Sequence, residues 1–89
     1  MELHLLEEPD SLKKKRAVVK SLKDRVRNRF GASIAEVDDL EKWQRATLGI
    51  AFVTGEKKNA ESVLSKIAGY VESDGSVEII GCITEYCTL

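Results

Sequence analysis

Two hydrophobic periods alternate along the chain. Leucines alternate with polar residues at positions 2–5, which predicts a short first strand. After two suitable helix caps, Asp10 and Ser11, apolar residues recur at steps of three and four through residues 12–30. This spacing predicts a helix of about five turns. Gly31 is a typical residue at which such a helix ends.

The rest of the chain repeats strand and helix periods. Residues 32–37 read as a second strand, and residues 45–54 alternate apolar and small or polar side chains in the manner of a third. After Gly55, apolar residues at helical spacing up to Val71 predict a second helix. Residues 76–88 then read as a long last strand that is apolar on both faces.

The order strand, helix, strand, strand, helix, strand predicts an α+β fold of the ferredoxin-like βαββαβ type. Its four-stranded antiparallel sheet would carry both helices on one face. Because 89 residues suffice for one domain and not for two, we expect a single domain over residues 1–89. The strands that start at Arg45 and Ser76 carry apolar groups on both faces. We therefore expect another subunit to cover the open face, which makes a homo-oligomer; curling of the last strand is the alternative.

Composition narrows the class of protein. Hydrophobic residues make up 43% and charged residues 33% of the chain, with one proline, which is typical of an ordered globular domain. The first apolar stretch is too short for a signal-peptide core, and no run approaches the roughly 18 apolar residues of a membrane span. We expect a cytoplasmic protein with no membrane partner.

The sequence also lacks patterns for common catalytic chemistry. Cys82 and Cys87 lie in the predicted last strand on opposite faces, which excludes a disulfide between them. His4 is the only histidine, and no CxxC pair or glycine-rich phosphate loop is present. We therefore expect no metal, no cofactor and no enzymatic activity.

Charge is unevenly distributed although the formal net charge is only −1. Residues 11–30 contain nine basic residues and one acidic residue, Asp24, whereas the other 69 residues contain five basic and 14 acidic residues. At 100° per residue, five of the basic side chains fall within one sector beside the apolar stripe, forming a ridge about 20 Å long. This basic ridge consists of Lys13, Arg16, Lys20, Lys23 and Arg27.

Three interpretations of the basic ridge remain open. It is a solvated face balanced by acidic groups, a surface that contacts nucleic-acid phosphates, or a surface for an anionic membrane. Lys15 differs because it falls on the apolar stripe, where it must snorkel or meet a carboxylate. We expect a structural ion pair with Glu36 or Asp38.

Two smaller clusters precede the third strand. Trp43, with Gln44 and Arg45, serves as a lid on the core edge or as an anchor for a partner or a base. Glu36 and Asp38 are two apart on a strand and so share a face, where they form a weak candidate metal pair with Asp39 nearby.

The runs SLKKKRAVVKSLKDRVRNRF, SIAEVDD and WQRATLGIAFVT resemble the bacterial YlxP-like domains of unknown function. The matching motif positions are Ser11, Leu12, Lys13, Lys15 and Arg16 in the helix, and Trp43, Gln44, Arg45 and Ala46 at the strand start. The resemblance implies a ferredoxin-like fold and no known activity. Such proteins are often encoded near ribosome-binding factor A, which implies an RNA or ribosome context by association. One departure is a first strand that begins late.

Two functions follow from these observations. The first is a small module that binds RNA or the ribosome through the basic ridge, with an affinity that falls steeply with salt. The alternative is a homo-oligomeric interaction or scaffold domain without nucleic-acid binding, built from the open sheet face and Trp43. A metal enzyme using Glu36, Asp38 and Arg45 is disfavoured.

Overall fold

The computed structural model describes residues 1–88 and contains four strands and two helices. The elements, in chain order, are β1 (Glu2–Leu5), α1 (Leu12–Phe30), β2 (Ser33–Asp38), β3 (Arg45–Ala51), α2 (Lys57–Ser73) and β4 (Val77–Gly81). Each of the six predicted elements is present in the predicted order. The fold is therefore the expected ferredoxin-like α+β arrangement.

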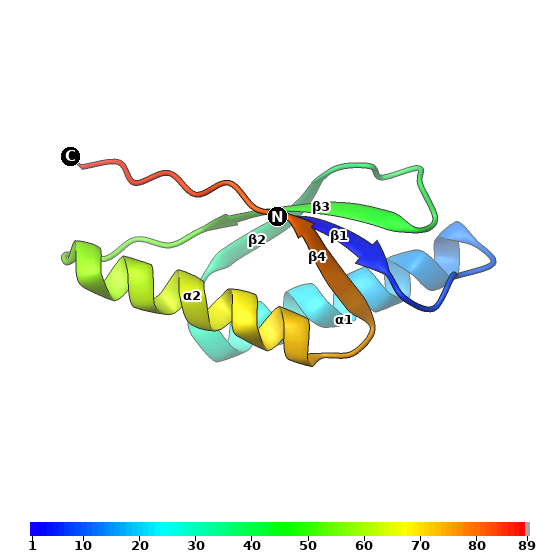
Figure 1. The fold of residues 1–89 in the computed structure, drawn as a ribbon, viewed down its shortest axis with the longest axis horizontal. Helices are drawn as coiled ribbons and strands as arrows, with labels where there is room; N and C mark the ends of the chain where they lie inside the picture. Colours follow the sequence, from blue (N-terminus) through cyan, green and yellow to red (C-terminus); the bar gives the residue numbers. More distant parts are fainter. Residues whose placement is uncertain (89) are drawn as a thin grey trace.

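The sheet has the order β2-β3-β1-β4, and each pair of neighbouring strands is antiparallel. The first strand thus lies in the interior of the sheet, while β2 and β4 form its edges. Leu3 pairs with Ala46 on one side and with Ile79 on the other, so these three side chains share one face. Both helices cover that face, with α1 beside β2 and α2 beside β4 (Figure 1).

The hydrophobic core lies between the helices and the sheet. Each strand contributes alternate residues to it, as the period of two requires, and each helix contributes one stripe. Its buried apolar members are Leu3, Leu5, Val19, Leu22, Val26, Ala32, Ile34, Ala46, Leu48, Ile67, Val71 and Val77.

The ends of α1 follow the capping signals in the sequence. Ser11 has an extended backbone and its side chain accepts a hydrogen bond from the Lys14 N–H at 3.2 Å. At the other end, Gly31 adopts φ +67° and its N–H donates to the Arg27 carbonyl. A left-handed residue at this position is typical of helix ends, and glycine adopts it without steric cost.

Two predicted strands are shorter than expected. The third strand ends at Ala51 rather than Thr54, and β4 ends at Gly81 rather than Thr88. Residues 82–88 form neither strand nor helix and are exposed. Cys82 and Cys87 therefore lie outside the sheet as free thiols, and the placement of both in a strand was wrong. The alternating pattern persists there, but an alternating segment becomes a strand only where a neighbour pairs with it.

The face of the sheet without helices is more polar than the pattern indicated. Residues on this face include His4, which pairs with Arg45 on one side and Glu78 on the other. Val37 and Ile80 are its exposed large apolar side chains. Within residues 1–88, neither helix combines the length and apolar character that crossing a membrane requires.

Candidate nucleic-acid interface

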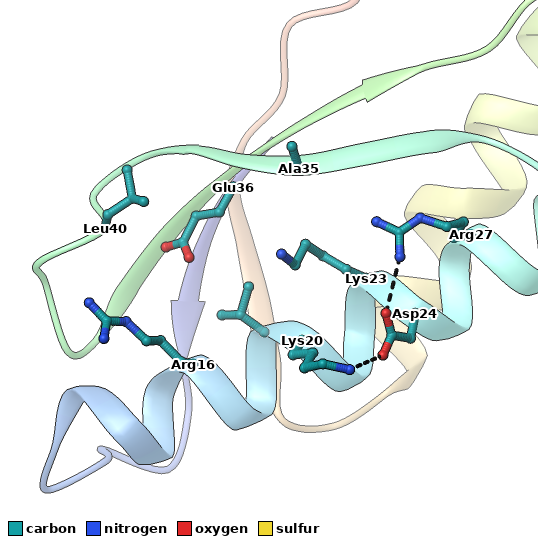
Figure 2. Close-up of a pocket in the computed structure, with 9 residues that line it drawn as sticks. Arg16, Lys20, Lys23, Asp24, Arg27, Ala35, Glu36 and Leu40 are labelled. Carbon is teal, nitrogen blue, oxygen red and sulfur yellow. Dashed lines mark hydrogen bonds and ion pairs between the residues drawn. The ribbon is translucent and has the colours of Figure 1, made fainter.

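The basic ridge lines a groove between α1 and the edge strand β2. The groove has a volume of about 550 Å³. Figure 2 shows Lys23 and Arg27 extending from α1 toward β2 and Arg16 extending toward the loop that follows it, while Lys20 lies along the helix toward Asp24. We call this feature the α1–β2 groove; it is lined by Arg16, Val19, Lys20, Lys23, Asp24, Arg27, Ala35, Glu36 and Leu40. Four of the five predicted ridge residues are thus brought together, while Lys13 is exposed near the start of the helix and outside the groove lining.

Asp24 partly neutralises the groove. Its two carboxylate oxygens pair with Lys20 at 2.7 Å and with Arg27 at 3.1 Å (Figure 2). The hydrogen bond from Lys20 is the main reason that the pKa of Asp24 lies below its usual value. The carboxylate is therefore charged at neutral pH, and the four basic side chains of the groove retain a net positive charge.

The edge of β2 adds backbone groups to this surface. Arg27 donates from Nη2 to the Ile34 carbonyl at 3.1 Å, which shows that this carbonyl points away from β3. Backbone direction alternates along a strand, so the N–H and carbonyl of Ile34 face outward together. The Arg27 guanidinium thus binds one of these outward carbonyl groups. The Arg16 guanidinium has a weaker partner, because its Nη2 lies 3.9 Å from Oε1 of Glu41.

Lys15 confirms the expected structural ion pair. The side chain is fully buried and pairs with Glu36, and it also donates to the Asp39 carbonyl at 3.1 Å. Lys15 therefore joins α1 to the loop between β2 and β3. Because Glu36 is engaged by this buried lysine, its charge is balanced inside the domain rather than at the groove.

Glu36 and Asp38 do not form the candidate metal pair. The pairing register of β2 shifts between Glu36 and Asp38, which breaks the regular alternation of faces. Glu36 turns toward Lys15, whereas Asp38 accepts a hydrogen bond from the Asp39 N–H. Asp39 in turn accepts from the Thr47 hydroxyl and pairs with Lys42, which lowers its pKa. Among residues 1–88, no group of three or more histidine, cysteine, aspartate or glutamate side chains is arranged so that it could hold a metal ion.

The WQRA segment stands at the junction of the loop with β3. Gln44 accepts a hydrogen bond from the Leu5 N–H through its backbone carbonyl, and Arg45 begins the strand. Half of the Trp43 surface is exposed, at 49%, so it is not a closed lid over the core edge.

The basic side chains on the other flank of α1, outside the groove, contact residues of α2 and its C-terminal end. Arg25 pairs with Asp74, and Arg29 lies over the ring of Tyr70.

Comparison with known proteins places this fold in a family. A family model described as "Protein of unknown function (DUF503)" matches residues 1–83. The chain belongs to the DUF503 family. It is also 38% identical over 68 residues to "Uncharacterized protein YlxP" of Bacillus subtilis (strain 168), a match that spans 76% of this chain and 74% of the relative.

In this DUF503 member, the structure adds two features of the groove that the sequence analysis missed. Asp24 was noted only as the single acid of the basic segment, although its spacing of four from Lys20 and three from Arg27 is a signal for ion pairs. Ala35 and Leu40 also line the groove, and no local pattern predicts that, because their approach to α1 depends on the packing of β2.

Proposed function

We propose that this DUF503 domain is a non-catalytic module that binds RNA, in a ribosomal or other structured context, through the α1–β2 groove. The observation that carries the proposal is that Arg16, Lys20, Lys23 and Arg27 line one groove. Of the two acidic residues in its lining, Glu36 is paired with the buried Lys15, so only Asp24 offsets the charge of these four side chains. Lysine and arginine side chains at this density bind successive phosphates with little dependence on base sequence.

The residues that line the groove support contact with the phosphate backbone of the RNA rather than stacking on its bases. Its lining contains no aromatic side chain, whereas stacking on sheet aromatics is the usual mode of RNA-recognition motifs. Four phosphate contacts predict that the logarithm of the association constant falls by roughly 3 for each tenfold rise in salt. Affinity for RNA would therefore be high only at low salt.

The test compares two double charge reversals of equal size. R16E/K23E reverses two groove residues without disturbing Asp24, and K58E/K66E reverses two exposed residues of α2. Binding is measured by fluorescence anisotropy with single-stranded and hairpin RNA, and with duplex DNA, between 25 and about 200 mM salt. We expect R16E/K23E to lose at least tenfold in RNA affinity and to flatten the salt dependence, while K58E/K66E retains most of the affinity. Equal losses in the two variants would contradict the proposal.

A homo-oligomeric scaffold is the second candidate, and one observation favours it. Val37 and Ile80 are exposed on the sheet face that no helix covers, with exposed fractions of 59% and 42%. Contact between two such faces would bury both side chains in each copy. Light scattering on V37K and I80K variants tests this idea: a dimer that dissociates in both variants favours the scaffold, and a monomeric wild type excludes it.

A further inference from the structure

The free edge of β2 forms the wall of the α1–β2 groove that faces the basic side chains. Within the part of the chain that the structure describes, β2 pairs with β3 alone, so its other side has no neighbouring strand. The Ile34 carbonyl lies on that free side, because it accepts from Nη2 of Arg27 at 3.1 Å. The N–H and carbonyl of one residue in an antiparallel strand point the same way, so the Ile34 N–H also faces outward.

Glu36 presents a second outward pair of backbone groups. It lies opposite Leu48 of β3, and Leu48 donates its N–H to the Met1 carbonyl on the side of β1. The backbone groups of Leu48 are therefore turned away from β2, and those of Glu36 face the free edge. The outward carbonyls of Ile34 and Glu36 are two residues apart, which is roughly 7 Å along a strand. Since the Glu36 side chain is held by Lys15, this wall offers backbone groups rather than charge.

The two walls of the groove require different chemical groups from a ligand. The side chains of α1 are cationic donors, which phosphate oxygens satisfy. The edge of β2 offers carbonyls as well as N–H groups, and a phosphate has no hydrogen to donate to a carbonyl. At one end the groove is a single side chain wide, because Arg27 donates both to Asp24 on its own helix and to the Ile34 carbonyl. A ligand that fills this space must bring anionic groups to α1 and hydrogen-bond donors to β2.

We propose that the edge of β2 binds ribose 2′-hydroxyl groups of an unpaired RNA strand whose phosphates lie against α1, so that the groove distinguishes RNA from DNA. The inference rests on the proposed function for its phosphate contacts. A 2′-hydroxyl can donate to a carbonyl and accept from an N–H, and deoxyribose has no such group. Each nucleotide carries one phosphate and one ribose, so successive nucleotides along the groove supply both walls.

An added strand from a partner protein is a poorer occupant of the same edge. The register shift between Glu36 and Asp38 interrupts the edge, so that within β2 the regularly spaced outward groups are those of Ile34 and Glu36. The Arg27 guanidinium also covers the Ile34 carbonyl. Bulges and charged side chains at an edge strand are features that prevent its pairing with another chain.

The test compares three labelled oligonucleotides of about twelve nucleotides that differ only at the 2′ position. They are oligouridine RNA, its 2′-deoxy form and its 2′-fluoro form, and neither of the last two can donate from that position. We expect the RNA to bind at least about fivefold more tightly than both others, in line with two neutral hydrogen bonds. Because the three probes carry the same phosphates, their affinities should depend on salt with nearly equal slopes.

Two single variants of equal charge locate the hydroxyl contact. R27M removes a phosphate ligand together with the side chain that covers the Ile34 carbonyl, whereas R16M removes a phosphate ligand elsewhere in the groove. Both should weaken RNA and DNA binding, but only R27M should raise the ratio of RNA to DNA affinity, about twofold, because the carbonyl is then free for a hydroxyl. Hydrogen exchange of the Ile34 and Glu36 N–H groups should slow at least tenfold with RNA bound, and less with DNA.

Two results would overturn this inference and leave the proposed function standing. One is equal binding of the RNA and 2′-fluoro probes, with both weakened in R16E/K23E; the other is the same ratio of RNA to DNA affinity in R27M and R16M. Binding of no oligonucleotide, or binding that R16E/K23E leaves unchanged, would overturn both proposals. Slower exchange at Ile34 and Glu36 with the peptide acetyl-Glu-Val-Glu-Val-Glu-Val-amide, and not with RNA, would overturn the inference by assigning the edge to a protein strand.

Discussion

Lys15 places a charged group at a fully buried position of α1. Its ammonium group pairs with Glu36 and also contacts the carbonyls of Asp39 and Leu40, at 3.1 and 3.4 Å. Burying a charge is costly unless every donor finds an acceptor, and here three acceptors surround it. The lysine of the helix motif is therefore explained by the structure of the domain, without any role for it in binding.

Replacing Lys15 with methionine should destabilise the domain strongly. The change keeps an unbranched side chain, one atom shorter, but leaves Glu36 without its partner. Removing one member of a buried pair costs about 3 kcal/mol or more. Urea unfolding measures this loss. The exposed K14M change should cost much less, and K15M/E36L should recover part of the loss because no buried charge remains. Equal midpoints for K15M and K14M would contradict this interpretation.

Asp74 should contribute to the stability of the fold in acid. Its pKa is held below the usual value, first by the hydrogen bond from Arg25 and then by the one from Ser76. The unfolded carboxyl therefore takes up a proton at higher pH than the folded one. The stabilisation is present above about pH 4, the ordinary value for aspartate, and is lost as pH falls through the lower folded pKa.

The D74N variant tests this sign. At pH 7 it should lose about 1 kcal/mol, a modest value because the Arg25 side chain is 41% exposed. Thermal unfolding between pH 7 and 2 should show the gap to the wild type narrowing below pH 4. The exposed E72Q change serves as a control. A D74N gap that stays constant down to pH 2 would exclude the pKa shift as its source.

At the scale of elements, α1 packs against the core and also carries the proposed binding surface, in which Asp24 lies. Its carboxylate holds Lys20 and Arg27 on the helix surface, so an incoming phosphate must compete with it. Because its pKa is lowered, protonation does not relieve this competition near neutral pH. The helix therefore carries an internal competitor for its own proposed ligand.

The D24N variant should bind RNA more tightly than the wild type. Removing one exposed carboxylate from the groove should raise affinity roughly threefold at low salt, in line with the small energies of surface ion pairs. The salt dependence should also steepen. D10N is the matched control, since Asp10 pairs with Lys14 on the opposite flank of the helix. Equal gains in both variants would show that only net charge matters.

The elements also differ in how far sequence alone predicts them. The ends of α1 follow from Ser11 and Gly31, because capping depends on neighbours within a few residues. The end of the last strand does not follow from residues 82–88, because strand pairing depends on whether β1 reaches them. Strand pairing also explains why the predicted metal pair did not form. The register shift in β2 separates Glu36 from Asp38, and a single sequence gives no signal for such a shift.

For the groove, the helical wheel predicted Arg16, Lys20, Lys23 and Arg27 on one side because they belong to one regular helix. The opposite wall of the groove does not follow from the helical wheel. The approach of Ala35 and Leu40 is set by the packing of β2 against α1, which is a property of the whole fold.

At the scale of the whole molecule, charge is separated between one helix and the rest. Residues 11–30 hold nine of the 14 basic residues, while 14 of the 15 acidic residues lie elsewhere. A polyanion is therefore attracted toward α1 and repelled by the remaining surface. Such fields act on the rate of association more than on the lifetime of a complex.

The rate at which the proposed RNA complex forms should therefore depend on distant charges only at low salt, and on the charges of the groove at both low and moderate salt. In E61Q/E72Q, two exposed acids of α2 are neutralised outside the groove. At about 10 mM salt, where the screening length is roughly 30 Å, this change should raise the association rate about twofold. At about 150 mM the length is roughly 8 Å, and the gain should vanish while R16E/K23E remains slow. Stopped-flow anisotropy measures both rates, and a gain in E61Q/E72Q that persists at the higher salt would indicate direct contact between α2 and the RNA.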